Sequence, residues 1–197
     1  MSENQRVRLS KQLLKDSLIR LLHDNSIHNI SVREICENAQ INRTTFYKYY
    51  GSQYDLLECV ENELLTEIDG RLDPSENDNF YIRLEKVLSY AMEKIELCRL
   101  LFNNNVDPEF PGKLFSLPRV QEMLSQQLTD RYNEDEVKYI SCFIVNGGFG
   151  IMRQWINAAN PESPKGIASL IDSIFARLFS NSPHNTAEKL SGKKCEK

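Results

Sequence analysis

The sequence lacks the marks of several classes of protein. Its five cysteines lie far apart without a C-x-x-C pair, and its three histidines are scattered, so we expect reduced thiols, no metal site and no bound cofactor. The longest apolar stretch, at residues 139–152, falls short of the roughly 20 residues that a bilayer span needs. The polar start MSENQRVRLSKQ is unlike an export signal. We therefore expect a cytoplasmic protein without a membrane span.

Catalytic motifs are missing as well. The sequence holds neither a G-x-S-x-G elbow nor an H-E-x-x-H pair. The glycines of residues 147–150 (GGFG) lack the G-x-G-x-x-G spacing, a preceding strand and a following Lys-Ser/Thr, so they do not predict a nucleotide-binding loop. With 41% hydrophobic and 26% charged residues, the 197-residue chain is suited to a folded core. We expect a globular protein that is not an enzyme.

Proline is absent from the first 73 residues, and glycine occurs there only twice, which favours helices. Apolar spacing predicts a first helix over about residues 10–24, with Ser10 as its N-cap. A second helix is predicted to begin at a capping box, in which Ser31 and Glu34 satisfy each other's end amides. The first part of the chain is therefore predicted to be helical from its beginning.

Two more helices follow in this part of the chain. Asn42 is a suitable cap for a short third helix with Phe46 and Tyr50 on its inner side, and Ser52 is a suitable cap for a fourth helix over about residues 53–69. No alternating β pattern of convincing length occurs anywhere in the sequence. The fold class that we predict is all-α.

The second part of the chain begins after a polar segment, GRLDPSENDN at residues 70–79, which we interpret as a hinge. Three prolines limit residues 106–118 to a short helical turn or loop. The helices predicted around it are a long one from about Leu84 to the NNN at 103–105, one near 120–128, one at about 134–158 and one at 164–180. The count for the whole chain is about nine helices.

Charge is distributed unevenly along the chain. The formal net charge is −4, yet residues 1–50 hold eight basic against five acidic residues, which is a local excess of positive charge. Residues 51–197 hold the remaining 16 basic and 23 acidic residues. The two parts present fields of opposite sign, so a polyanion is expected to meet the first part.

The second and third predicted helices are short, lie in the positive part and are joined by a three-residue break, which is a helix-turn-helix pattern. In RTTFYKYY, Arg43 can pair with guanine in the major groove, and Thr44 and Thr45 can touch thymine methyls or phosphates. Lys48 is a further basic residue on the outward side, and the hydroxyl of Tyr47 can reach a phosphate oxygen. These residue types on the second helix of the pair favour binding of double-stranded DNA.

Residues 9–62, which include IHNISVREICENAQINRTTFYKYYGSQYDLLECV, resemble the DNA-binding domain of the TetR family of bacterial transcriptional regulators. IVNGGFGIMRQWI is similar to the penultimate helix of many such regulators. The resemblance implies an all-helical homodimer with a C-terminal regulatory domain, usually a repressor that a small-molecule effector releases from a palindromic operator. Carried over by position, it marks as DNA-facing Ser31, Arg33, Arg43, Thr44, Thr45, Tyr47, Lys48 and Tyr49.

Three positions depart from the family pattern. Gln40 stands at a turn position where glycine is frequent, so a left-handed backbone there would carry a cost. Tyr49 stands where histidine is common. Gln53 replaces a frequent phosphate-contacting lysine, which should remove one charge contact and weaken the salt dependence of binding.

The later helices hold two sets of candidate residues. Aromatic and sulfur-containing side chains could line an effector pocket, although at helical spacing such residues are more often plain core; they are Tyr81, Tyr90, Met92, Phe102, Phe115, Met123 and Tyr132. Small and apolar residues could form a homodimer seam, or could instead be buried within one subunit; they are Gly147, Gly148, Ile151, Trp155, Leu170, Ile174, Phe175 and Leu178. The sequence does not identify the effector.

These observations predict three parts of the chain and leave two other functions open. The parts are a helix-turn-helix domain at 1–52, a regulatory and dimerisation domain at 53–180 whose helix 53–69 links the two, and a tail at 181–197 that we expect to be disordered. The first alternative function is a helical dimer that acts through a protein partner without strong DNA binding. The second is a bundle that binds or converts a small molecule, which the lack of a catalytic grouping disfavours.

Overall fold

The computed structural model describes residues 3–73, 79–103, 106–128 and 132–180, and within these ranges every regular element is a helix. The predicted hinge falls partly, and the predicted disordered tail entirely, outside the described residues. The elements in chain order are α1 (Glu3–Leu22), η1 (Ile27–Asn29), α2 (Val32–Ala39), α3 (Arg43–Tyr47), α4 (Gln53–Arg71), α5 (Phe80–Glu93), α6 (Ile95–Phe102), α7 (Phe110–Phe115), α8 (Pro118–Leu128), α9 (Glu134–Ile156) and α10 (Pro164–Ser180).

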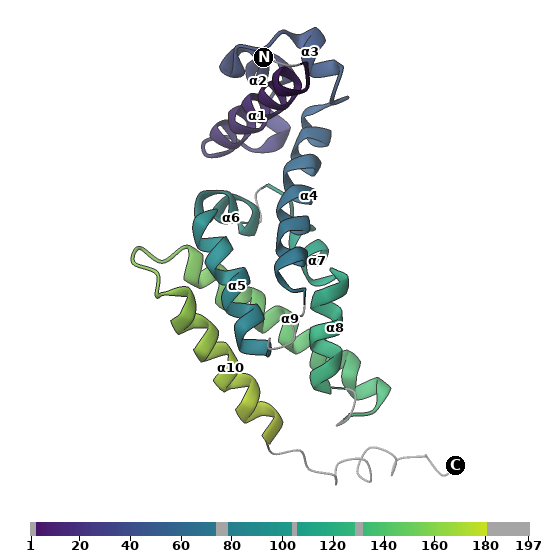
Figure 1. Ribbon diagram of the computed structural model, residues 1–197, viewed down its shortest axis with the longest axis vertical. Coiled ribbons are helices and arrows are strands. Elements are labelled where there is room, and N and C mark those ends of the chain that lie inside the picture. The colour runs from purple at the N-terminus through teal and green to yellow at the C-terminus, as the bar shows by residue number, and fades with distance from the viewer. Residues whose placement is uncertain (1–2, 74–78, 104–105, 129–131, 181–197) are drawn as a thin grey trace, which may run out of the picture.

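Helices α1 to α3, which we call the head, pack at one end of the molecule (Figure 1). Leu14 and Leu18 of α1, Ile35 of α2 and Phe46 of α3 are completely buried, and Leu56 of α4 joins them. Burial of such a side chain is worth about 1.5–3 kcal/mol, so these five residues fix how the short helices α2 and α3 lie on α1. The helical spacing of these apolar residues thus places them on the inner faces of the helices, where they pack together as the core of the head.

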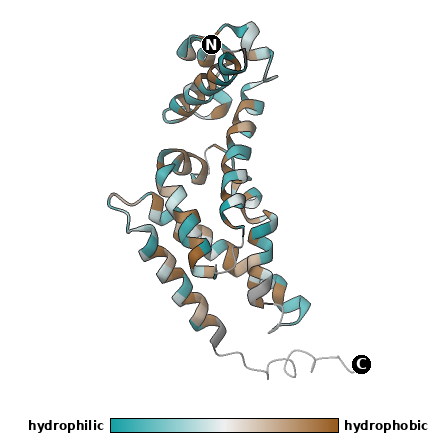
Figure 2. Cartoon of the chain, in the orientation of Figure 1, coloured by the Kyte–Doolittle hydropathy of each residue, from teal (hydrophilic) through white to brown (hydrophobic). Residues whose placement is uncertain are grey.

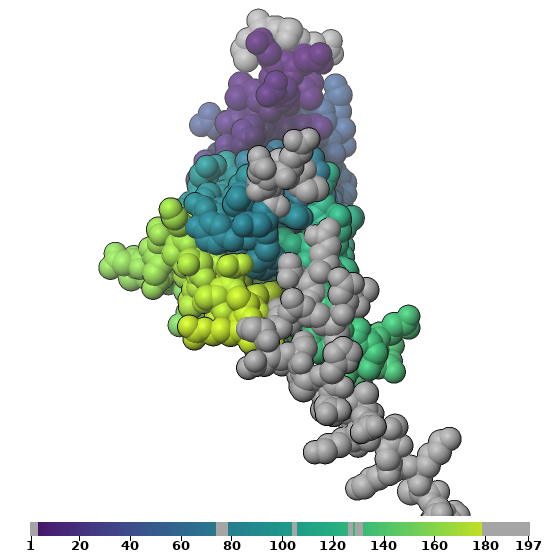
Figure 3. Space-filling view, turned by 60° about the horizontal axis from the view of Figure 1, so that its bottom comes forward, coloured from purple at the N-terminus to yellow at the C-terminus, as the bar shows by residue number. Residues whose placement is uncertain are grey.

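Helix α4 runs from the head into a second group of helices, α5 to α10, which we call the body (Figure 1). In the body α4 packs against α5, α7 and α8, while α6 packs against α9. Helices α5 and α10 lie side by side over most of their length and form one face of the molecule (Figures 1 and 3). Hydrophobic residues occur on every body helix, which matches a core shared among them (Figure 2).

Two predicted boundaries are wrong. Helix α1 begins at Glu3 instead of after Ser10, because nothing in residues 3–10 breaks a helix, and Ser10 lies inside it. The long helix predicted before residue 103 is two helices, since Lys94 leaves the helical region with φ −111° and ψ 28° and starts α6 in a new direction. Among the described residues we find no helix with the length and apolar character that crossing a membrane requires.

Candidate nucleic-acid interface

Helix α2 begins at the predicted capping box. The hydroxyl of Ser31 accepts a hydrogen bond from the backbone N–H of Glu34 (3.2 Å), and the Glu34 carboxylate accepts one from the backbone N–H of Ser31 (2.8 Å). The hydrogen bonds from Ser31 lower the pKa of Glu34, because they stabilise its charged form. The Ser31 hydroxyl, which also donates to this carboxylate, is engaged within the helix start.

The turn between α2 and α3 requires a left-handed residue. Gln40 adopts φ 54° and ψ 38°, and it is the only non-glycine residue with positive φ in the described part of the chain. Its backbone N–H donates to Glu37 O, and the next N–H, of Ile41, donates to Cys36 O at 2.9 Å. The conformation expected from the sequence is therefore present, and a residue with a Cβ occupies it at a cost of about 1–2 kcal/mol.

Helix α3 has only five residues and is held from one side. The side chain of Asn42 caps it by accepting a hydrogen bond from the N–H of Thr44 (2.8 Å), and Phe46 anchors it in the core of the head. Arg43, Thr44, Tyr47 and Lys48 are exposed, and Thr45 is half-buried. Within the described residues, neither Arg43 nor Lys48 forms an ion pair. The outer face of α3 therefore offers two cations without a carboxylate partner.

Arg33, also predicted to face DNA, has a partner on its own helix. Its Nε donates to Glu37 Oε1 at 2.7 Å, one turn along α2, and the hydrogen bond and charge of Glu37 raise the pKa of Arg33. The two side chains are 67% and 61% exposed, so water screens the pair and its contribution to stability is small. Such a pair can open when a stronger anion is offered.

Tyr49 follows α3 and is half-buried. The ammonium of Lys48 lies 5.9 Å from the centre of its ring, and the ammonium of Lys11, from α1, lies 5.2 Å from it. The sequence analysis did not single out Lys11, because no local spacing relates residue 11 to residue 49. The fold alone brings α1 to the end of α3.

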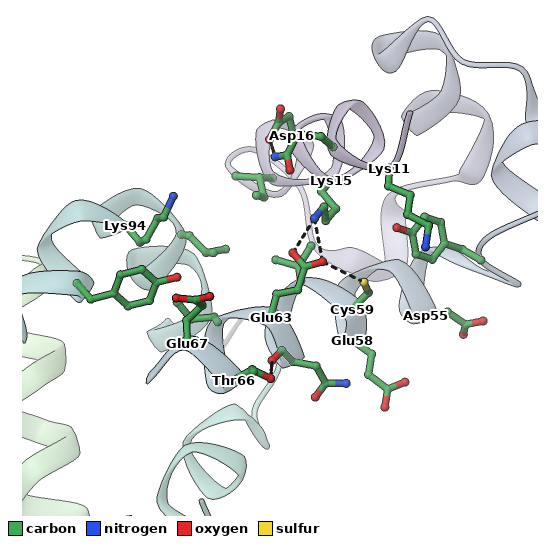
Figure 4. A pocket seen from close by; sticks show the side chains of 18 of the residues that line it. Lys11, Lys15, Asp16, Asp55, Glu58, Cys59, Glu63, Thr66, Glu67 and Lys94 are labelled. Carbon is green, nitrogen blue, oxygen red and sulfur yellow. Dashed lines mark hydrogen bonds and ion pairs between the residues drawn. The ribbon is translucent and has the colours of Figure 1, made fainter. Parts of the chain in front are cut away.

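An open cleft of about 1110 Å³ separates the head from the body along α4 (Figure 4). Lys11, Lys15, Glu63 and Lys94 are among the charged residues that line it. Lys15 Nζ donates to both carboxylate oxygens of Glu63 (2.9 and 2.6 Å), and Cys59 Sγ lies 3.7 Å from one of them. The pair between Lys15 and Glu63 ties α1 of the head to α4.

A second charged group joins α4 to the body. Lys113 Nζ of α7 donates to Glu61 Oε2 and to Asp107 Oδ2, both at 2.7 Å, and the Glu61 side chain is only 2% exposed. Burial raises the pKa of Glu61, whereas hydrogen bonds from Lys113 and from a backbone N–H lower the pKa of Asp107. Further along, Arg119 of α8 holds Asp69 at 2.7 Å. These contacts fasten α4 to the body.

The seven side chains predicted to line an effector pocket are spread through the body. Phe102 is completely buried, with its ring stacked on Phe149 at 5.3 Å, and Met123 is also buried in the core. Tyr90 lies at the edge of the cleft described above, whereas Tyr132 borders a small apolar groove at the far end of the molecule. Tyr81, Met92 and Phe115 are partly buried against the core. Their shared role as a pocket stays a prediction.

The residues predicted for a dimer seam divide into inner and outer groups. Trp155 is only 3% exposed and donates to Glu162 O within the same subunit, so its side chain contributes to the core of that subunit. Gly148 faces Phe115, and the ring of Phe175 is tilted against that of Phe80, with 4.9 Å between the ring centres. Ile151 and Ile174 are half-buried, and the outward members are Gly147, Leu170 and Leu178.

Two exposed apolar residues of α9 were not among the site residues predicted from the sequence. Tyr139 is 80% exposed and Phe143, one turn later, is 65% exposed. They border the small apolar groove together with Leu178 of α10. The i, i+4 spacing of the two aromatic residues was the available signal, and Gly147 continues it by one further turn.

A helix-turn-helix head joined by one long helix to an all-helical body defines a class of DNA-binding regulators. The sequence profile of bacterial regulatory proteins of the tetR family matches residues 16–60, and that of a transcriptional regulator C-terminal region matches residues 78–177. The protein belongs to the TetR family of bacterial transcriptional regulators.

Individual relatives are distant. The uncharacterized HTH-type transcriptional regulator YxbF of Bacillus subtilis is 21% identical over 165 residues, which are 80% of this chain and 42% of that protein. The dhaKLM operon transcriptional activator DhaS of Lactococcus lactis is 32% identical over 66 residues, which are 33% of this chain and 35% of that protein. The matches thus span less than half the length of these curated relatives. A solved TetR regulator from Streptococcus agalactiae shares the fold, with 18% identity, a TM-score of 0.67 and coverage of 88% of this chain and 97% of that one.

Proposed function

We propose that this protein is a homodimeric repressor that binds a palindromic DNA operator and is released from it by a small-molecule effector. In this proposal residues 1–52 read DNA, residues 53–180 bind the effector and form the dimer, and helix α4 couples the two. The observation that carries the DNA-binding part is the face of α3, where Arg43, Thr44 and Lys48 are exposed and the two cations have no ion-pair partner in the described structure.

Each predicted DNA contact has a distinct chemical role in the proposal. Arg43, at the first position of α3, reads a guanine edge in the major groove, where a bidentate pair discriminates against a wrong base by about 1–3 kcal/mol. Thr44 and Thr45 contact thymine methyls or phosphates, and Tyr47 and Lys48 contact phosphates. Ser31, Arg33 and Tyr49 lie beside the duplex, where Ser31 keeps α2 in place and Arg33 exchanges Glu37 for a phosphate.

Exposed apolar residues on α9 and α10 support the homodimer. Tyr139 and Phe143 of α9 and Leu170 and Leu178 of α10 are 45–80% exposed, and Gly147 and Gly150 leave open space on α9 where a second helix can approach closely. A seam of these residues, repeated by a two-fold axis, would place two heads on one duplex at a fixed separation.

The anchoring of α4 supports control by an effector. Ion pairs join α4 to α1 through Glu63 and to α7 and α8 through Glu61 and Asp69, so a displacement of the body helices changes the position of the head. An effector that binds more tightly to a dimer with a different separation of the two heads would then weaken operator binding. The size of this effect is set by the difference between its affinities for the DNA-binding and the non-binding conformation. The relative DhaS is described as a transcriptional activator, so whether this protein represses or activates transcription needs a test of its own, after DNA binding has been established.

Selection of binding sites from a randomised duplex library, with the full chain at two salt concentrations, tests the proposal. We expect an enriched palindrome whose half-sites lie about one helical turn or a small multiple apart, with weaker binding at the higher salt concentration. Enrichment of a single, non-repeated half-site would contradict the homodimer. No enrichment at low salt would contradict DNA reading and favour the alternative of a protein partner.

A further inference from the structure

Two lysines on the same face of α1, one helical turn apart, have different surroundings (Figure 4). Lys15 is largely buried and binds both oxygens of Glu63. Lys11 is exposed, rests its ammonium 5.2 Å from the centre of the Tyr49 ring, and forms no ion pair with any described residue. The cation nearer to α3 is therefore the one left without an anion.

The same ring carries a second ammonium, that of Lys48, at 5.9 Å. An exposed contact between a cation and an aromatic face is weak, and two ammonium groups near one ring repel each other. Asp55, the acidic residue in the first turn of α4, uses its oxygens to accept from Gly51 N (3.0 Å) and Ser52 Oγ (2.7 Å). An anion held between the two lysines would relieve their repulsion.

We propose that Lys11 and Lys48 bind one DNA backbone phosphate beside the ring of Tyr49, an inference that rests on the proposed DNA-binding function. Residues 49–53, which connect α3 to the start of α4, contain no cation, so α1 supplies the charge that this connection lacks. A duplex presents one negative charge per ~1.7 Å of its axis, so a phosphate lies within reach of any head that lays α3 in the groove.

Arg8 extends this site. It lies three residues before Lys11 on the same face of α1, is exposed, and forms no ion pair with the described residues. Arg8 lies within α1, because this helix begins at Glu3. In the proposal Arg8 binds the neighbouring phosphate along the same strand, so the first three turns of α1 follow the DNA backbone.

The test is the salt dependence of binding to the duplex enriched by selection, measured between about 50 and 200 mM salt. Each lost phosphate contact lowers the slope of log K against log salt by about 0.9. Because Lys48 still contacts the same phosphate, we expect Lys11→Gln to lower the magnitude of the slope by less than this amount, and Lys11→Gln with Lys48→Gln to lower it by about this amount. The preferred sequence and the thermal unfolding midpoint of Lys11→Gln should stay unchanged. Lys11→Arg should retain the slope, and adding Arg8→Gln to Lys11→Gln should lower it once more.

Lys94→Gln is the matched control, because it removes the same charge from an exposed lysine on the body side of the same cleft. Its slope should equal that of the unmodified protein. The inference is overturned if Lys11→Gln keeps the full slope, if Lys94→Gln lowers the slope equally, or if Lys11→Gln changes the preferred base sequence. If the unmodified chain selects no duplex at all, the proposed function fails, and the phosphate site fails with it.

Discussion

The charges of the head and those that fasten α4 to the body are arranged in opposite ways. On the head, Arg43, Lys48 and Lys11 are exposed and form no ion pair with described residues. Between α4 and the body, Glu61 is buried and held by Lys113, and Asp69 is held by Arg119. Paired charges fix one helix against another, whereas unpaired cations are available to a polyanion. The difference supports the head as the part proposed to meet an external polyanion, while the paired charges fasten α4 to the body.

Removal of Lys113 should have the largest effect, because it takes the cation away from the buried carboxylate of Glu61. Lys113→Met leaves Glu61 buried without its cation, a change that costs about 3–5 kcal/mol in fully buried pairs. Because the Lys113 side chain is 38% exposed, we expect a loss of about 2–3 kcal/mol in the free energy of unfolding, measured by urea denaturation near neutral pH. Adding Glu61→Gln should recover most of it; an equal loss in the double variant would contradict the charge explanation.

The loss caused by Lys113→Met should depend on pH. Burial raises the pKa of Glu61, so the carboxylate form disfavours folding as pH rises above its unfolded value, and Lys113 opposes this effect. The pKa of Asp107 is lowered in the folded state, so its favourable contribution is present above its unfolded value and is lost as pH falls. Protonation of Glu61 makes the difference between the two proteins shrink as pH falls towards 4, and loss of the Asp107 contribution shrinks it further only below about 3.8, the ordinary pKa of that carboxyl. A constant difference across this range would contradict them.

Arg43→Ala should have the next largest effect, on the affinity for DNA and not on the stability of the fold. A bidentate contact to guanine predicts a loss of about 1–3 kcal/mol in binding and relaxed specificity at one base position, with little change in stability. Repeated site selection with the variant measures both. Lys94→Ala serves as the control for a general loss of charge, and an unchanged selection profile in Arg43→Ala would refute its role.

Gln40→Gly should stabilise the turn of the head by up to about 1 kcal/mol, because glycine adopts φ 54° without the penalty of a Cβ. The matched control is Gln12→Gly in the exposed middle of α1, where glycine should destabilise by about 0.5–1 kcal/mol. Thermal unfolding of the two variants should therefore shift in opposite directions. A shift of the same sign would show that strain at Gln40 does not limit stability.

The smallest expected effect concerns the one pair on the predicted DNA face. Glu37→Gln releases Arg33 from an exposed pair that water screens, so the free energy of unfolding should hardly change. DNA binding should tighten slightly, as Arg33 becomes free for a phosphate. If the tightening persists when Arg33→Gln is added, it arises from loss of the Glu37 charge near DNA, and Arg33 is no contact.

Short-range features of the head could be predicted from the sequence. The capping box of Ser31 and Glu34 and the caps Asn42 and Ser52 are confirmed, because each cap and its partner lie within three residues. The all-α class is confirmed for the same reason, since 3.6-residue spacing is a local property. The left-handed conformation of Gln40 was expected from the resemblance to the TetR family, in which glycine is frequent at this turn position.

Contacts between distant residues could not be predicted in this way. Lys113 meets Glu61 across 52 residues, and Lys11 meets Tyr49 across 38, so no spacing rule connects them. The burial of Trp155 within one subunit could not be predicted, because an aromatic residue on an apolar helix face is equally compatible with a core and a seam. No proline or glycine stands at Lys94, so the end of α5 at this point could not be predicted from the residue types.

The shortness of α3 limits how much information one subunit can extract from DNA. Five helical residues rise about 7.5 Å, which spans only two to three base-pair steps of ~3.4 Å. A head that fully specifies about three base pairs accepts roughly one sequence in 64, and two heads together accept roughly one in 4,000. A genome offers about a million or more competing sites. A palindrome read by α3 alone would thus recur hundreds of times, so the remaining discrimination has to come from the shape and flexibility of the duplex between and beside the two heads.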